Sequence, residues 1–101
     1  MQKKNRIVNL VLLKELRKKA CFACKSSQVE IHHVKSKKSG GHDVESNLWP
    51  LCRLHHVEVH KIGLNRFVTK YNLSIWLCKN GWEFSSLTSK WFHNTKGGAI
   101  E

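Results

Sequence analysis

The stretch EIHHVKSKKSGGHDVESNLWPLCRLHHVEVH, residues 30–60, contains the features that decide the fold. Two pairs of adjacent histidines stand in it, His32 with His33 and His55 with His56. Consecutive residues of a strand point to opposite faces, and consecutive residues of a helix are turned by about 100° from one another. The two side chains of a pair therefore cannot bind the same atom. Each pair is expected to contain two histidines with different roles.

A strand, a loop and a helix are expected around these histidines. VEIHHV, residues 29–34, alternates and is rich in β-branched residues, which predicts a strand. Residues 35–46 contain two glycines and many polar residues, which predicts a loop, and residues 47–52 return toward the first cysteines. The apolar pattern of residues 54–71 predicts a helix, which Gly63 weakens.

The flanking segments give a weaker pattern. Apolar residues at mostly helical spacing predict a first helix over residues 5–19 that ends near Ala20. The C-terminal part is expected to contain a short helix or strand up to Cys78, a turn at Asn80 and Gly81, a hairpin of residues 82–84 with residues 90–93, and frayed residues 94–101.

The cysteines indicate a zinc site. Cys21 and Cys24 form a CxxC, and Cys52 stands three residues before His55 at the start of the expected helix. Three thiolates and one imidazole suit a closed tetrahedral structural zinc. Cys78 is the competing fourth ligand and would make an all-cysteine site, although its apolar neighbours favour a buried free thiol.

A second metal site is expected beside the first. His56 and His60 are four residues apart on one helix face, a spacing that can place two imidazoles on one metal. The pair His32 and His33 could complete this site, with one histidine as a ligand and the other free for chemistry.

Residues 30–60 resemble the HNH endonuclease motif, whose named positions are matched by His33, Asn47 and His56. The glycines and aspartate of GGHD, residues 40–43, resemble the loop of that family. The CxxC and CxxHH resemble its zinc-knuckle subgroup, which usually has cysteine at the position of His55. The resemblance covers residues 21 to about 71.

The resemblance implies an α+β fold. Its centre would be a ββα-metal unit stapled by a zinc knuckle of three cysteines and one histidine, with an N-terminal helix and a small C-terminal helix or hairpin extension. Residues 1–101 are expected to form a single nuclease domain, with the core motif at 21–71 and the extension at 72–101.

The resemblance also implies roles for individual residues. His33 would be the general base that takes a proton from the attacking water, and Asn47 would brace the strand that carries it. His32, His56 and His60 would bind the catalytic divalent ion. Three imidazoles favour Zn²⁺, Ni²⁺ or Mn²⁺, whereas Mg²⁺ prefers oxygen ligands.

The charge of the chain indicates a polyanionic partner. Among its 101 residues, 18 Lys and Arg against 7 Asp and Glu give a formal net charge of +11. Such a charge attracts nucleic acid, and DNA is the expected partner. The candidate phosphate contacts flank the expected site and are Lys35, Lys37, Lys38, Arg53, Lys61 and Arg66. No secretory signal or membrane segment is expected, which predicts a cytoplasmic location in a bacterium or a phage-infected host.

The predicted function is that of a metal-dependent HNH endonuclease that hydrolyses DNA phosphodiester bonds, similar to the small phage and mobile-element members. One alternative is a non-catalytic zinc-knuckle DNA-binding module. Another is an accessory protein of recombination or packaging with a degenerate site. The sequence contains no dimerisation signal, so that both a monomer and a homodimer stay open.

Overall fold

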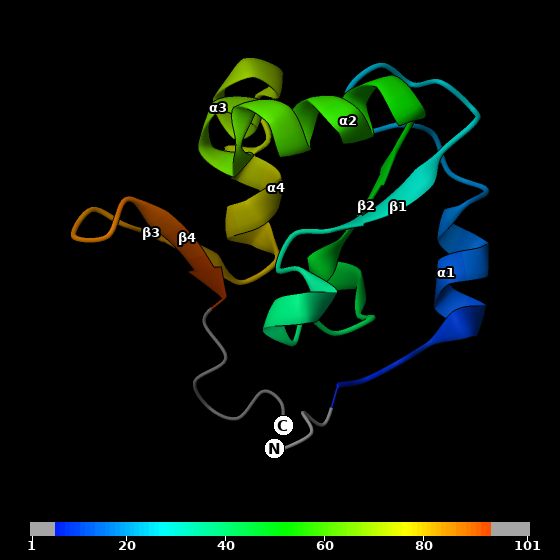
Figure 1. Cartoon of the computed structure of the whole chain (residues 1–101), viewed down its shortest axis with the longest axis horizontal. Coiled ribbons are helices and arrows are strands. Elements are labelled where there is room, and N and C mark those ends of the chain that lie inside the picture. The colour runs from blue at the N-terminus through cyan, green and yellow to red at the C-terminus, as the bar shows by residue number, and fades with distance from the viewer. Residues whose placement is uncertain (1–5, 94–101) are drawn as a thin grey trace. The chain divides into compact units, whose positions relative to one another are not determined.

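The computed structural model describes residues 6–93, and the chain forms two compact units that divide between Lys61 and Ile62 (Figure 1). The first unit contains the histidine pairs and the first three cysteines, and the second contains Cys78 and the C-terminal hairpin. Helices and short strands are mixed in the chain, which confirms the predicted α+β class. No helix within residues 6–93 is long and apolar enough to span a bilayer.

The first helix, α1, is shorter than the sequence pattern predicts. It runs over Leu10–Leu16 and begins at Asn9, whose side-chain oxygen accepts a hydrogen bond from the Leu12 N–H at 3.0 Å. Residues 6–9 are not helical because they bond to a distant loop instead; the Asp43 N–H, for example, donates to the Ile7 carbonyl at 2.8 Å. The predicted start at residue 5 lies outside the described residues.

Two antiparallel strands form the centre of the first unit. β1, Glu30–His33, pairs with β2, Leu48–Leu51, in a register that places His32 opposite Trp49 and His33 opposite Leu48. Every residue of β2 is buried. Two short 3-10 turns, Lys37–Ser39 and Glu45–Asn47, shape the connecting loop.

The predicted long helix is two helices. α2, Arg53–Ile62, buries His55 and Val59, which are four residues apart and share one face. α3, Leu64–Tyr71, follows after Gly63, whose φ of 91° lies in the left-handed region that favours glycine and ends the helical path. The apolar periodicity continued across the break, so only the glycine indicated it.

The second unit contains α3, a helix α4 over Ser74–Lys79, and a hairpin of β3, Trp82–Ser85, with β4, Lys90–His93. The predicted hairpin is thus confirmed, and the segment before it is a helix. Leu77 and Trp82 are buried, so Trp82 packs in the interior of this unit. The predicted fraying of residues 94–101 lies outside the described residues.

Candidate functional site

The turn that carries the first two cysteines has the geometry of a knuckle. The Lys25 N–H donates to the Cys21 carbonyl at 2.9 Å, and Lys25 adopts a left-handed φ of 69° that reverses the chain. The Phe22 N–H donates to the Pro50 carbonyl at 2.9 Å, which ties the knuckle to β2. Since Cys52 directly follows β2, this bond brings the two cysteine-bearing segments together.

Cys21, Cys24, Cys52 and His55 meet in one cluster, with their candidate ligand atoms within 4.8 Å of one another. The sulfurs of Cys24 and Cys52 are 3.7 Å apart, and Nδ1 of His55 lies 3.2 Å from the sulfur of Cys52. A tetrahedral zinc with Zn–S bonds of about 2.3 Å separates its sulfurs by about 3.8 Å. The cluster therefore fits a structural zinc, which the chemistry of three thiols and an imidazole also favours.

Cys21 is prepared for metal binding by its surroundings. Burial opposes its charged form, but backbone N–H groups directed at the sulfur, including that of Ala23 at 3.3 Å, lower the pKa of Cys21 below its ordinary value of 9.0. A lower pKa favours the thiolate, which is the form that binds zinc.

Cys78 does not belong to this cluster. It lies on α4 in the second unit and is exposed, so the expectation of a buried thiol was wrong. The apolar neighbours in sequence were misleading because on α4 they occupy other faces, with Leu77 buried and Cys78 turned to solvent.

A second cluster joins β1 to α2. His32, His56 and His60 offer ligand atoms within 4.8 Å of one another, and their ring centroids are 5.1 to 5.3 Å apart. His56 and His60 are one helical turn apart on α2, and His32 lies on β1. The three imidazoles that were expected to share one ion are therefore neighbours in the structure.

Burial determines the charge of His32. Its side chain is 7% exposed and packs beside the ring of Trp49, with centroids 5.9 Å apart. Burial, together with repulsion from His56, His60 and His33, lowers the pKa of His32 from 6.5 to about 3. The imidazole is thus neutral at physiological pH and keeps a lone pair for a metal ion.

Glu30 orients His56. Oε1 of this carboxylate accepts a hydrogen bond from Nδ1 of His56 at 2.8 Å, and Oε2 lies 3.3 Å from Arg53. The bond from His56, aided by Arg53, lowers the pKa of Glu30 below its ordinary value. Because Nδ1 of His56 donates to the carboxylate, Nε2 keeps its lone pair for a metal ion. Such a hydrogen bond fixes the tautomer of metal-binding histidines.

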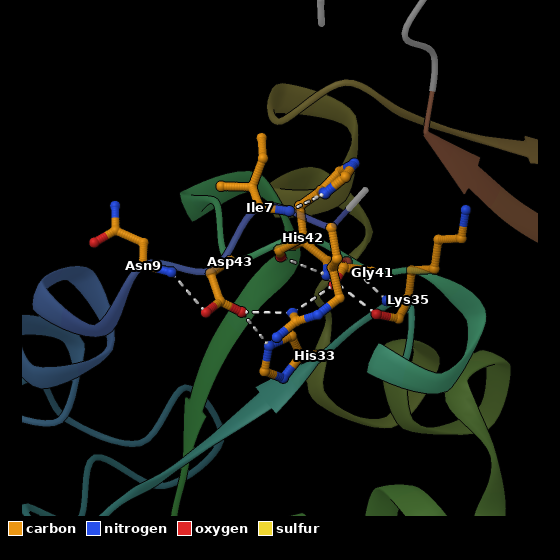
Figure 2. A network of polar contacts seen from close by, with 9 residues as sticks. Ile7, Asn9, His33, Lys35, Gly41, His42 and Asp43 are labelled. Atoms are coloured by element: carbon orange, nitrogen blue, oxygen red, sulfur yellow. Dashed lines mark hydrogen bonds and ion pairs between the residues drawn. The ribbon is translucent and has the colours of Figure 1, made fainter. Parts of the chain in front are cut away.

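His33 lies next to this cluster in sequence but has a different partner. Its Nε2 atom lies 2.8 Å from Oδ1 of Asp43, a carboxylate that is 1% exposed. Figure 2 shows His33 reaching from β1 to the loop that contains Asp43. The two histidines of the first pair thus contact different groups, as the strand geometry predicts.

Asn47 braces the loop that begins after His33. Its Oδ1 accepts from the Lys35 N–H at 2.7 Å, while its Nδ2 donates to the carbonyls of Lys35 and His42 at 3.1 and 3.0 Å. Its own carbonyl accepts from the Val34 N–H at 2.9 Å. These bonds connect both ends of the loop and hold the residues that follow His33 in place.

A family comparison agrees with this arrangement. Residues 20–62 match the sequence model described as HNH endonuclease. We call this matched segment the HNH domain. The comparisons with curated proteins and with solved structures gave no match. The HNH domain includes both candidate metal clusters, His33 and Asn47, and it ends with α2.

The basic residues expected to contact phosphate are exposed. Lys35, Lys37 and Lys38 lie on the loop of the HNH domain, and Arg53 and Lys61 lie near the two ends of α2. Arg66 lies on α3, outside the HNH domain and in the second unit.

Several residues that support the HNH domain were missed by sequence reasoning. Arg6, Ile7 and Asn9 contact its loop from outside residues 20–62, where Nδ1 of His42 accepts a bond from the Ile7 N–H at 2.9 Å. These contacts join residues 34 to 37 positions apart, where no local spacing could indicate them.

Proposed function

We propose that this HNH domain is a metal-dependent endonuclease that hydrolyses phosphodiester bonds in DNA. The observation that supports the proposal most is the placement of two adjacent residues of β1. His32 joins His56 and His60 in a cluster of ligand atoms, while His33 stays outside that cluster. One strand thus supplies a metal ligand and a separate imidazole at consecutive positions, as a metal-assisted hydrolase needs.

The three-imidazole cluster suits a divalent ion. His32 is neutral, and the bond from His56 to Glu30 leaves a ring nitrogen of His56 open. When bound, the ion supplies Lewis-acid stabilisation of the negative charge that develops on the phosphate. The nitrogen ligands favour Zn²⁺, Ni²⁺ or Mn²⁺ over Mg²⁺.

His33 acts as the general base. It takes a proton from the water that attacks the scissile phosphate, a role for which imidazole is suited near neutral pH. Asn47 contributes by position, because its bonds to Lys35 and His42 hold the loop that follows the base. A displacement of about 1 Å can reduce a rate about a hundredfold.

The remaining candidate residues fold the domain and bind its substrate. Cys21, Cys24, Cys52 and His55 hold the structural zinc, which supplies folding energy to a small chain. DNA is held by charge contacts from Lys35, Lys37, Lys38, Arg53, Lys61 and Arg66, which position the backbone without reading its sequence. We place the activity inside the cell, in the manner of small phage nucleases.

The test is cleavage of supercoiled plasmid by the purified zinc-loaded chain with EDTA, Mg²⁺, Mn²⁺, Ni²⁺ or Zn²⁺. His33→Ala should reduce cleavage by about 10² to 10⁴, because it removes the base. His93→Ala is the matched control, because His93 bonds to the Asn80 carbonyl in the second unit. This variant should cleave the plasmid as fast as the parent protein does.

The products and failures of this assay are informative. Nicked plasmid indicates cutting of one strand, and linear plasmid indicates cutting of both, as a homodimer could do. Equal cleavage by His33→Ala would refute the assignment of the base. Salt-sensitive DNA binding without cleavage by any ion would instead support a non-catalytic DNA-binding module.

A further inference from the structure

Asp43 is buried at the centre of a hydrogen-bond network that reaches the proposed base (Figure 2). Its Oδ1 lies 2.8 Å from Nε2 of His33 and 2.9 Å from Nη1 of Arg6. Its Oδ2 accepts from the Asn9 backbone N–H at 2.9 Å. All three partners are able to donate, so this carboxylate is surrounded by donors.

The network depends on the segment before α1. Arg6 and Asn9 donate to the Asp43 carboxylate, and the Asp43 backbone N–H in turn donates to the Ile7 carbonyl at 2.8 Å. Arg6 also donates to the Gly41 carbonyl at 2.8 Å. The segment and the loop of residues 41–43 are thus bonded through main chain and side chains. Residues 6–9 lie outside the HNH domain, yet they determine where its Asp43 carboxylate points.

The charge of Asp43 determines which nitrogen of His33 holds a proton. Burial opposes the charged form of Asp43, but the bonds from His33, Asn9 and Arg6 outweigh it and lower the pKa of Asp43 to about 2. An ionised carboxylate only accepts hydrogen bonds, so Nε2 of His33 must donate. In a neutral imidazole the other nitrogen, Nδ1, then has the free lone pair.

We infer that Asp43, anchored by Arg6 and Asn9, is a positioning residue that holds His33 in the Nε2–H form with Nδ1 as the proton-accepting atom. The inference rests on the proposed nuclease function. In the step, an O–H bond of water breaks and its proton moves to Nδ1, while the water oxygen forms a bond to phosphorus. The bond from phosphorus to the leaving oxygen breaks, and that oxygen takes a proton from solvent.

The carboxylate also matters after the proton has moved. His33 then carries a positive charge, and Asp43 at 2.8 Å is the negative group that faces it. Arg6 shares the same oxygen, which keeps Asp43 ionised and limits its movement. A carboxylate that only anchored the loop would have no effect on which ring nitrogen of His33 is protonated.

The test compares the zinc-loaded parent with Asp43→Asn and Glu45→Gln. An amide at position 43 can turn its NH₂ toward His33 and then favours the Nδ1–H form. Glu45→Gln removes the same charge from an exposed carboxylate of the same loop and is the matched control. Zinc content and far-UV circular dichroism establish that the variants fold.

Two measurements are made on each protein. The ¹⁵N chemical shifts of the His33 ring, assigned by comparison with His33→Ala, give the tautomer without any substrate. Plasmid cleavage gives kcat and KM separately. We expect the Nε2–H form in the parent, and in Asp43→Asn a shift toward Nδ1–H with a kcat reduced roughly a hundredfold and KM within about twofold.

The outcomes separate this inference from the nuclease proposal. An Nδ1–H tautomer in the parent would overturn the role of Asp43, even if Asp43→Asn could not be folded. An unchanged tautomer and kcat in Asp43→Asn would overturn it too. If the tautomer shifts as expected but the parent cleaves nothing with any ion, the nuclease proposal fails while the positioning of His33 by Asp43 stands.

Discussion

The burial of His32 links the stability of the protein to pH. The pKa of His32 in the folded protein is about 3, below the ordinary value of 6.5. Between these two pH values the unfolded chain binds a proton at His32 and the folded chain does not. The contribution of His32 to stability is therefore complete above pH 6.5 and is lost as the pH falls toward 3. Below pH 6.5 the loss approaches about 1.4 kcal/mol per pH unit.

We expect urea denaturation of the protein, loaded with zinc at the cysteine cluster only, to show this loss between pH 7.5 and 5.5. His32→Phe retains a ring beside Trp49 but cannot take up a proton, so its free energy of unfolding should depend less on pH. Equal pH dependence in the two proteins would show that His32 is not the responsible group.

Gly41 is required by the close approach of two backbone segments. A Cβ atom at this position would lie 1.7 Å from the Lys35 carbonyl oxygen and 2.9 Å from Nδ2 of Asn47. Gly41→Ala should therefore lower the free energy of unfolding by roughly 2 to 3 kcal/mol, as overpacking does. Calorimetry beside Lys38→Ala, an exposed change in the same loop, tests this, and a Tm equal to that control would contradict it.

Residues could be predicted where their spacing is local. His56 and His60 are one helical turn apart, and the placement of His32 and His33 on a strand separates their directions, so the sequence contained that part of the site. Arg6 and Asn9 could not be predicted, because their bonds to Asp43 span 34 to 37 positions and follow no periodicity. Only the three-dimensional path of the segment reveals them.

At the scale of elements, the knuckle and α2 depend on the same cluster. Cys52 immediately precedes α2, and His55 is buried in its first turn, so zinc at this cluster would fix the start of the helix. His56 follows directly and belongs to the second cluster. The position of the proposed catalytic ligands therefore depends on the cysteine cluster.

We expect Cys21→Ser to lose most of its zinc and to unfold cooperatively at a lower temperature, because a structural zinc supplies folding energy. Cys78→Ser is the matched control, since Cys78 is an exposed thiol on α4 outside the cluster. Zinc content by mass spectrometry and Tm by circular dichroism decide the matter. A Cys21→Ser protein with full zinc content and parental Tm would refute the cluster.

The elements themselves were predicted with two physical errors. The first helix was predicted to be too long because the helical spacing of apolar residues includes Ile7. The main chain at Ile7 instead accepts a hydrogen bond from the Asp43 N–H. A single helix was predicted after Cys52 because the apolar periodicity of α2 continues into α3 across Gly63. In both cases a competing backbone conformation prevailed over side-chain pattern.

At the scale of the whole molecule, the net charge of +11 makes binding to a polyanion sensitive to salt. Each phosphate contact that is removed should reduce the slope of log K against log salt by about 0.9. We expect a triple change of Lys35, Lys37 and Lys38 to Gln to reduce that slope by about 2 to 3, measured by fluorescence anisotropy with duplex DNA.

The control for this prediction changes the same number of charges elsewhere. Lys14, Lys18 and Lys19 lie on α1 and the turn after it, outside the loop of the HNH domain. Their replacement by Gln lowers the net charge equally, so an equal reduction of the slope in both variants would mean that net charge alone governs binding.

A single peptide bond joins the two clusters, since His55 belongs to one and His56 to the other. The cysteine cluster offers four ligands, three of them thiols, which close the coordination of a zinc ion, whereas the histidine cluster offers three and leaves a position open. A chelator should therefore abolish the proposed cleavage in two phases. The first would be fast and reversible on adding back the ion, as the open histidine cluster is emptied. The second would be slow and hard to reverse, since removing zinc from the four-ligand cysteine cluster releases the helix that carries both His56 and His60.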